Sequence, residues 1–149
     1  MALKLKIKKL HEDAIIPSYA KDGDACFDLT AVTAFRDDKF IQYNTGLAFE
    51  IPKGHVGLIF PRSSVTKKDM ILKNSVGVID SGYRGEVSFR FHAFKNEVLG
   101  MSIPSDNVYT AGERVGQMMI LPIPTVEFEE VDELSDSDRG EGGYGSTGK

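Results

Sequence analysis

The chain has 149 residues, of which 41% are hydrophobic and 27% are charged, and it contains one cysteine. This length and balance fit one globular domain and exclude a disulfide-scaffolded secreted protein. The formal net charge of −4 disfavours general nucleic-acid binding, which depends on dense neutralisation of phosphates. No stretch approaches the ~18 apolar residues of a membrane span. The start, MALKLKIKKL, has lysines between its apolar residues and lacks the apolar core of a signal peptide. We therefore expect a cytoplasmic protein that binds neither membranes nor nucleic acids.

Alternation of apolar and polar residues dominates the chain and predicts short strands. Leu3, Leu5 and Ile7 alternate with lysines, as expected of a half-buried strand with a lysine-rich outer face. Further apolar runs or alternating segments follow at 47–51, 56–60, 76–79, 87–94, 115–123 and 126–129. Sequences rich in Gly, Asp and Pro separate them. Many short strands at close spacing predict an all-β antiparallel sandwich or barrel.

Helical periodicity is confined to one short segment, 63–69, for which Ser63 or Ser64 is the expected N-cap. The stretch 100–107 contains Pro104 and is predicted to be a surface loop. From residue 129 onward the composition shifts to Asp, Glu, Gly and Ser, which by itself favours a disordered, solubilising tail. We therefore divide the chain into a β domain at 1–132 and a flexible, glycine-rich C-terminal arm at 133–149.

Several common catalytic motifs are absent or incomplete. His11, His55 and His92 lie far apart in the sequence without metal-ligand spacing, and Cys26 between Ala25 and Phe27 is typical of a small core residue. Residues 143–149 match the GxxxxGK part of a P-loop, but the chain ends at the lysine, where a P-loop needs a hydroxyl residue and a helix. The closely spaced amides and hydroxyls of this segment still suit a mobile cover over a phosphate chain.

Polar residues stand where predicted strands end, and each has an ordinary alternative. Arg62, Ser63 and Ser64 follow the run 56–60 and form either an anion site or a capped turn. Asp80 follows 76–79 and is either a base or a hairpin-turn residue. Gln117 lies inside an apolar run, where an amide must find partners or face a site. Together they favour hydrolysis of a phosphate anhydride by activated water, because no covalent nucleophile accompanies them.

Five segments in order resemble the motifs of the homotrimeric dUTP pyrophosphatases (dUTPases). They are DACFDLTA at 24–31, PRSS at 61–64, NSVGVIDSGYRG at 74–85, GERVGQM at 112–118 and RGEGGYGSTG at 139–148. Any one of these segments is unspecific, but five in this order are typical of that family. The resemblance implies a jelly-roll-like fold with one short helix. It also implies a homotrimer in which each active site takes residues from all three subunits.

The resemblance further implies hydrolysis of dUTP to dUMP and pyrophosphate with Mg²⁺ on the triphosphate. That reaction keeps uracil out of DNA and supplies dUMP for dTMP synthesis. Asp80 matches the catalytic aspartate that orients and deprotonates water, and Asp28 matches the carboxylate that supports the magnesium through water. The implied substrate contacts are Asn74, Gly77, Val78 and Ile79 for uracil, Tyr83 for deoxyribose, Arg62, Ser63, Ser64 and Gln117 for phosphate, and Arg139, Tyr144, Gly145, Ser146 and Thr147 in the closing arm.

Three departures from the family pattern accompany the resemblance. Cys26 stands where the first motif usually has glycine, Tyr144 replaces the usual phenylalanine, and 95–110 is longer than in compact members by about a hairpin. The longer stretch leaves open an added partner surface. Two alternatives remain: a dCTP deaminase, which shares the fold and nucleotide class, and a non-catalytic β-sandwich binding module. The glycine-rich fifth segment and the intact segment 80–83 favour dUTP hydrolysis.

Overall fold

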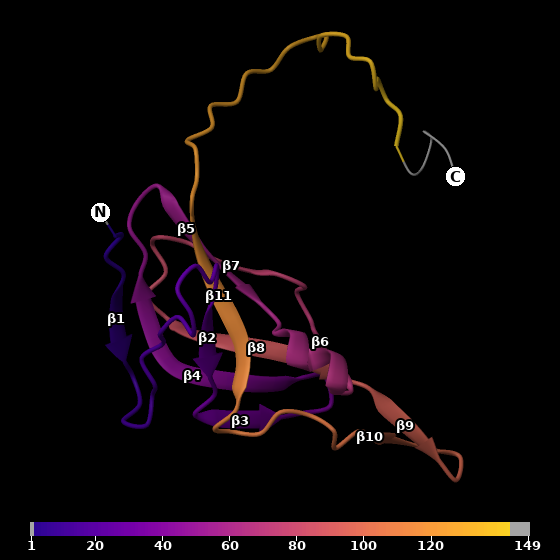
Figure 1. Ribbon diagram of the computed structural model, residues 1–149. Helices are drawn as coiled ribbons and strands as arrows, with labels where there is room; N and C mark the ends of the chain where they lie inside the picture. The colour runs from indigo at the N-terminus through magenta and orange to yellow at the C-terminus, as the bar shows by residue number, and fades with distance from the viewer. Residues whose placement is uncertain (1, 144–149) are drawn as a thin grey trace.

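Two antiparallel sheets pack face to face in the computed structural model, which describes residues 2–143 except for the side chains of Glu97 and Val98 (Figure 1). The first sheet has the order β1-β4-β8-β6, with β3 also paired to β4, and the second has the order β2-β11-β5-β7. The first comprises β1 (Lys6–Lys9), β3 (Thr33–Arg36), β4 (Ile41–Glu50), β6 (Met70–Leu72) and β8 (Glu86–Ala93). The second comprises β2 (Phe27–Thr30), β5 (His55–Phe60), β7 (Gly77–Ile79) and β11 (Arg114–Pro122). The predicted all-β fold is confirmed.

The core lies between the two sheets and follows the predicted alternation. In β8, Val87, Phe89 and Phe91 are buried, whereas the residues between them are half-buried or exposed. Leu29 of β2 and Met118 of β11 contribute fully buried side chains from the facing sheet. Because each strand buries one face, the pairing register of neighbouring strands is fixed. A slip of one residue would turn the apolar side chains toward solvent.

Segment 95–110 forms a small separate hairpin of β9 (Lys95–Val98) and β10 (Met101–Pro104), which extends away from the sandwich (Figure 1). The predicted surface loop at 100–107 is therefore wrong for the residues of β10. The local sequence hides this pairing because β10 is exposed along its length and shows no buried alternate face.

The strand predicted at 126–129 is wrong. The last strand of the second sheet, β11, ends at Pro122, and Pro124 follows two residues later. Proline donates no backbone hydrogen bond to a ladder, so this sequence stops the strand. Val126 and Phe128 are consequently 61% and 93% exposed, and residues 121–141 are exposed throughout.

The first strand also begins later than its sequence pattern indicates. β1 starts at Lys6 and pairs with β4, whereas Leu3 lies before it and is exposed. Ile7 is partly buried against the core and Lys6 forms an exposed ion pair with Glu50, as expected of a half-buried strand with lysines outside. Within residues 2–143, the structure has no helix of the length and apolar character that a membrane crossing requires.

Tyr43 gives the core a measurable pH dependence. Its side chain is fully buried, and its hydroxyl donates a hydrogen bond to the carbonyl oxygen of Tyr109 at 2.7 Å. Burial raises the pKa of Tyr43 to about 12. Between pH 10 and 12 the unfolded chain loses this proton while the folded chain keeps it, so the free energy of unfolding falls as pH rises.

We expect Tyr43 alone to lower the free energy of unfolding by about 1.4 kcal/mol per pH unit in that range. Urea unfolding at pH 10, 10.5, 11 and 11.5 measures the slope in this range. The Tyr43→Phe variant keeps the ring and removes the titrating group, so its slope should be shallower. Equal slopes for the two proteins would contradict the assignment.

Candidate active site

Three neighbouring strands of the second sheet bring Asp28, Arg62, Arg114 and Gln117 together. Gln117 of β11 pairs with Asp28 of β2 on one side and with the last residue of β5 on the other. Asp28 accepts from Arg62 Nε at 2.7 Å and from Arg114 Nη1 at 3.1 Å, and its side chain is only 24% exposed. Gln117 Nε2 donates to the Pro61 carbonyl oxygen at 2.9 Å. The two arginines and the amide are thus held at the ends of adjacent strands.

The predicted helix at 63–69 is a 3-10 helix at Ser63–Lys67, and its N-cap is Arg62. Neither serine caps it, which corrects the predicted N-cap. Ser63 is the first helical residue and is exposed, whereas the Ser64 hydroxyl accepts from Arg62 Nη1 at 3.2 Å. The Ser64 hydroxyl therefore points toward the arginine instead of capping the helix.

Strand β7 and its flanking turns carry the predicted uracil-binding segment. β7 pairs with β5, with Gly77 opposite Ile59, Val78 opposite Leu58 and Ile79 opposite Gly57. A Cβ atom at Gly77 would overlap the Ile59 side chain and lie 3.3 Å from Asn74 Nδ2. Only glycine therefore fits at Gly77, close against β5 and beside the Asn74 amide. Val78 is 61% exposed in the isolated chain.

Asp80 and Tyr83 lie in the turn that follows β7. Asp80 is exposed, and its backbone carbonyl accepts from the Tyr83 amide at 3.0 Å. The Tyr83 ring lies over Gly85, where any Cβ atom would overlap it, and its hydroxyl donates to the Glu86 carbonyl oxygen at 3.1 Å. The ring is therefore fixed in place while 45% of the residue stays exposed.

Asp80 and Arg62 lie beyond opposite ends of the segment of β5 that pairs with β7. Asp80 follows Ile79, the partner of Gly57, whereas Arg62 lies five residues beyond Gly57 in the other direction along the strand. At ~3.3 Å per residue this puts the two residues roughly 15–20 Å apart. One chain therefore does not bring Asp80 together with the Asp28, Arg62 and Gln117 group.

A polar hollow of about 290 Å³ adjoins Asp28 and is also lined by Asp24, Cys26 and Gln117. Burial, with a smaller contribution from Asp28, raises the pKa of the Cys26 thiol, so the thiol stays protonated at neutral pH. Residues 2–143 hold no cluster of three or more His, Cys, Asp or Glu side chains suited to a metal ion. The carboxylates present suit a cation held mainly by other ligands, as Mg²⁺ is when it binds substrate phosphates and water.

The described part of the arm includes Arg139 but not the rest of its predicted ligands. Arg139 is exposed and its Nε donates to the Gly142 carbonyl oxygen at 2.9 Å within a local turn. Tyr144, Gly145, Ser146 and Thr147 lie outside the described residues. In one chain Arg139 makes no bond to the residues gathered around Asp28.

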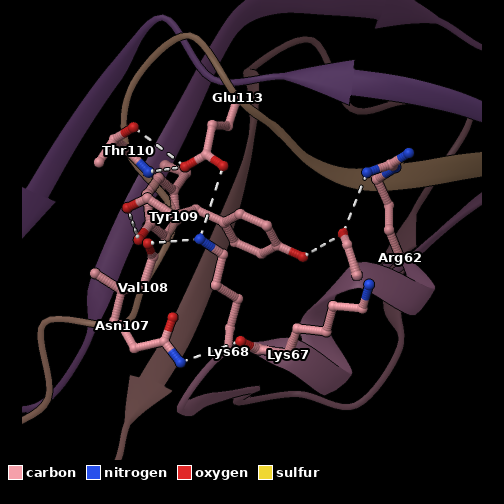
Figure 2. Close-up of polar contacts among 10 residues, drawn as sticks. Arg62, Lys67, Lys68, Asn107, Val108, Tyr109, Thr110 and Glu113 are labelled. Atoms are coloured by element: carbon pink, nitrogen blue, oxygen red, sulfur yellow. Dashed lines mark hydrogen bonds and ion pairs between the residues drawn. The ribbon is translucent and has the colours of Figure 1, made fainter.

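Sequence reasoning missed Arg114 and Tyr109. Arg114 stands in the fourth motif, and its pairing with Asp28 follows only from the β2–β11 register. Tyr109 is 4% exposed, and its hydroxyl lies 2.8 Å from Ser64 Oγ, although it precedes the fourth motif in an irregular segment (Figure 2). A large aromatic residue beside a polar motif is the one local signal that marks it.

An antiparallel β sandwich that gathers arginines, hydroxyls and an amide at its strand ends has the donor groups that suit a phosphorylated ligand. Comparison with known proteins identifies which family of β-sandwich proteins the chain belongs to. The dUTPase family model matches residues 12–148. The deoxyuridine 5'-triphosphate nucleotidohydrolase of Nautilia profundicola is 40% identical over 154 residues, which cover 99% of this chain and 100% of the relative.

Solved structures agree with this result. The Staphylococcus bacteriophage 80alpha dUTPase with dUPNHPP has a TM-score of 0.82 at 27% identity, covering 99% of this chain and 100% of that chain. A mutant dUTPase from phage phi11 of S. aureus, whose structure shows coordination of a structural Mg(II) ion, has a TM-score of 0.69 at 25% identity, covering 88% and 98%. The chain belongs to the dUTPase family.

The close approach of β7 to β5 predicts a sharp difference between two glycines of the hairpin. Gly77→Ala should lower the free energy of unfolding by about 1–3 kcal/mol, because the added methyl group overlaps Ile59. Gly82 has nothing within 4 Å of its Cβ position, so Gly82→Ala should stay within about 0.5 kcal/mol of wild type. Urea unfolding of both variants checks this, and similar values for the two would contradict the packing.

Proposed function

We propose that this protein hydrolyses dUTP to dUMP and pyrophosphate, with Asp80 as the base that activates water. Membership of the dUTPase family and the full-length match to a deoxyuridine 5'-triphosphate nucleotidohydrolase support the substrate. The main structural support for this mechanism is the exposure of Asp80 and its lack of bonding partners among the described residues. Its carboxylate is exposed at the end of β7, and within residues 2–143 it makes no hydrogen bond or ion pair. A carboxylate without partners is available to accept a proton from water.

The reaction needs no covalent intermediate. Asp80 accepts a proton from water, the water oxygen forms a bond to the α-phosphorus, and the bond from that phosphorus to the oxygen that bridges to the β-phosphate breaks. Pyrophosphate leaves with the bonding electron pair. Holding the water in line is the main task of the carboxylate, because positioning lowers the barrier by removing the entropy of a chance encounter.

The residues that bind the phosphates are Arg62, Ser63, Ser64 and Gln117. The Arg62 side chain is 23% exposed, and its guanidinium can present its remaining N–H groups to an anion while Nε stays bonded to Asp28. Arginine and hydroxyl donors match phosphate oxygens with charge-assisted hydrogen bonds. At the other end of the nucleotide, uracil is bound by amide and backbone groups. These belong to Asn74 and to the β7 residues Gly77, Val78 and Ile79.

Tyr83 excludes ribose. Its ring is held by its contact with Gly85 and by the hydrogen bond from its hydroxyl, so it cannot turn aside for a 2′-hydroxyl. A rigid side chain rejects ribose because the 2′-hydroxyl clashes with it, and this leaves the affinity for deoxyribose unchanged.

The complete site is shared between copies of the chain. Asp80 and Arg62 lie beyond opposite ends of the β7-paired segment of β5 in one chain, so a base and a phosphate contact on the same substrate must come from different subunits. A homotrimer with closed symmetry would repeat this contact three times. Exposed apolar side chains such as Val78 and Ile123, 61% and 49% exposed, supply surface for such contacts.

A magnesium ion bound mainly by the phosphate oxygens of the substrate would suit the region around Asp28. Asp28 is the carboxylate nearest the phosphate contacts, and its two arginine partners leave it suited to hold water around a cation and not to bind the ion alone. When bound, Mg²⁺ offsets charge that develops on the phosphate oxygens. The arm residues Arg139, Tyr144, Gly145, Ser146 and Thr147 then close over the nucleotide and exclude bulk water.

Asp80→Asn tests the proposed chemistry. An amide cannot accept the proton of water, so the variant should lose at least about 100-fold in kcat for dUTP while KM changes only a few-fold. Pyrophosphate release from dUTP, UTP, dCTP and dTTP, measured with a coupled phosphate assay, gives the rate and the specificity together. Wild-type turnover in the variant would exclude Asp80 as the base. Release of ammonia from dCTP by the wild-type protein would instead indicate a deaminase.

A further inference from the structure

Tyr109 connects the proposed phosphate site to the core. The residue is 4% exposed, and its hydroxyl lies 2.8 Å from Ser64 Oγ, which also accepts from Arg62 Nη1 at 3.2 Å. Figure 2 shows the Tyr109 ring reaching from the segment before β11 toward the 3-10 helix and Arg62. The position of the Ser64 hydroxyl therefore depends on a side chain that lies outside the five motifs.

The Tyr109 ring is fixed by its surroundings. It makes edge-to-face contacts with Tyr43 and Phe91, with centroid distances of 6.2 and 6.0 Å. The Tyr43 hydroxyl donates to its backbone carbonyl oxygen, and Lys68 Nζ lies 5.2 Å from its ring centroid. A ring packed in this way has a single rotamer, so its hydroxyl oxygen has a single position.

The 3-10 helix is tied to the same segment by further contacts, which keep Ser64 opposite Tyr109. Lys68 Nζ donates to the Val108 carbonyl oxygen at 3.1 Å and lies 3.7 Å from Glu113 Oε1 (Figure 2). Hydrogen bonds from the backbone amide and hydroxyl of Thr110, together with Lys68, hold the pKa of Glu113 below its usual range. Asn107 Nδ2 also donates to the Lys67 carbonyl oxygen at 3.1 Å.

The direction of the hydrogen bond between Tyr109 and Ser64 determines whether the Ser64 hydroxyl can also donate to a phosphate. A serine hydroxyl has one hydrogen and two acceptor lone pairs, and an arginine only donates. If Tyr109 donates to Ser64, the Ser64 oxygen accepts twice, from Tyr109 and Arg62, and its own hydrogen is free. If Ser64 donates to Tyr109, that hydrogen is already used. A phosphate oxygen only accepts, so the first arrangement is the one that binds it.

We propose that Tyr109 is a positioning residue of the phosphate site: its hydroxyl donates to Ser64 and so turns the Ser64 hydrogen, beside Arg62, toward a phosphate oxygen. This rests on the proposed function, in which Arg62 and Ser64 bind the triphosphate. In this proposal Tyr109 acts on the substrate only through Ser64.

A double-mutant cycle tests the proposal. Tyr109→Phe keeps the packed ring and removes only the hydroxyl, and Ser64→Ala removes the group through which it acts. Each variant should raise KM for dUTP by about three- to tenfold, the usual worth of one hydrogen bond, with kcat within about twofold of wild type. In the Ser64→Ala background, Tyr109→Phe should have no further effect, because its target is gone.

Tyr43→Phe is the matched control. It removes a second buried tyrosine hydroxyl but keeps the Tyr43 ring that packs against Tyr109 and leaves the Tyr109 hydroxyl in place. The variant should therefore lower the melting temperature while KM for dUTP stays near the wild-type value. Independent, multiplicative effects of Tyr109→Phe and Ser64→Ala would overturn the proposal, as would an unchanged KM in either single variant. A wild-type protein that releases no pyrophosphate from dUTP would overturn the proposed function itself, which separates the two failures.

Discussion

The antiparallel register of β5 with its two neighbours determines where Asp80 lies relative to Arg62 and Gln117. On one side, β11 places Gln117 beside the last residue of β5, next to Arg62 and Asp28. On the other side, β7 runs back along β5, so that Asp80 emerges at the opposite end. In this register Gly77 packs so closely against Ile59 that any side chain at position 77 would overlap it. One chain therefore keeps two candidate half-sites, the Asp80 end and the Arg62 end, apart along β5.

This separation gives a physical reason for assembly. A half-site with two arginines, and another with an exposed carboxylate and a fixed tyrosine ring, have complementary chemistry but no means of meeting within one chain. In the proposed homotrimer, symmetric association would bring the carboxylate end of one copy to the arginine end of another. The same association would cover Val78, which one chain leaves exposed on the hairpin. Stability of the oligomer and activity of the site are then linked, because the same contacts serve both.

The sequence predicted those features that depend on local pattern. Alternation identified β8 because Val87, Phe89 and Phe91 share one buried face, and the ordered motifs identified the family. The pattern failed at 126–129, where apolar alternation occurs without a partner strand among residues 2–143. It also failed at β10, which has a partner but no buried face. The Tyr109–Ser64 contact was out of reach, since it joins residues 45 positions apart through tertiary packing alone. The roles of the site residues remain predictions.

Complementation between two inactive variants tests the shared site most directly. Asp80→Asn and Arg62→Ala each remove one half-site, and co-expression with different tags allows mixed oligomers to be purified. If the base and the phosphate contact come from different subunits, random mixing restores about a quarter of the sites, because each site needs one intact residue from each of two subunits. Activity far above that of either variant alone is the predicted result. Mixed oligomers that are no more active than the single variants would contradict a site shared between chains.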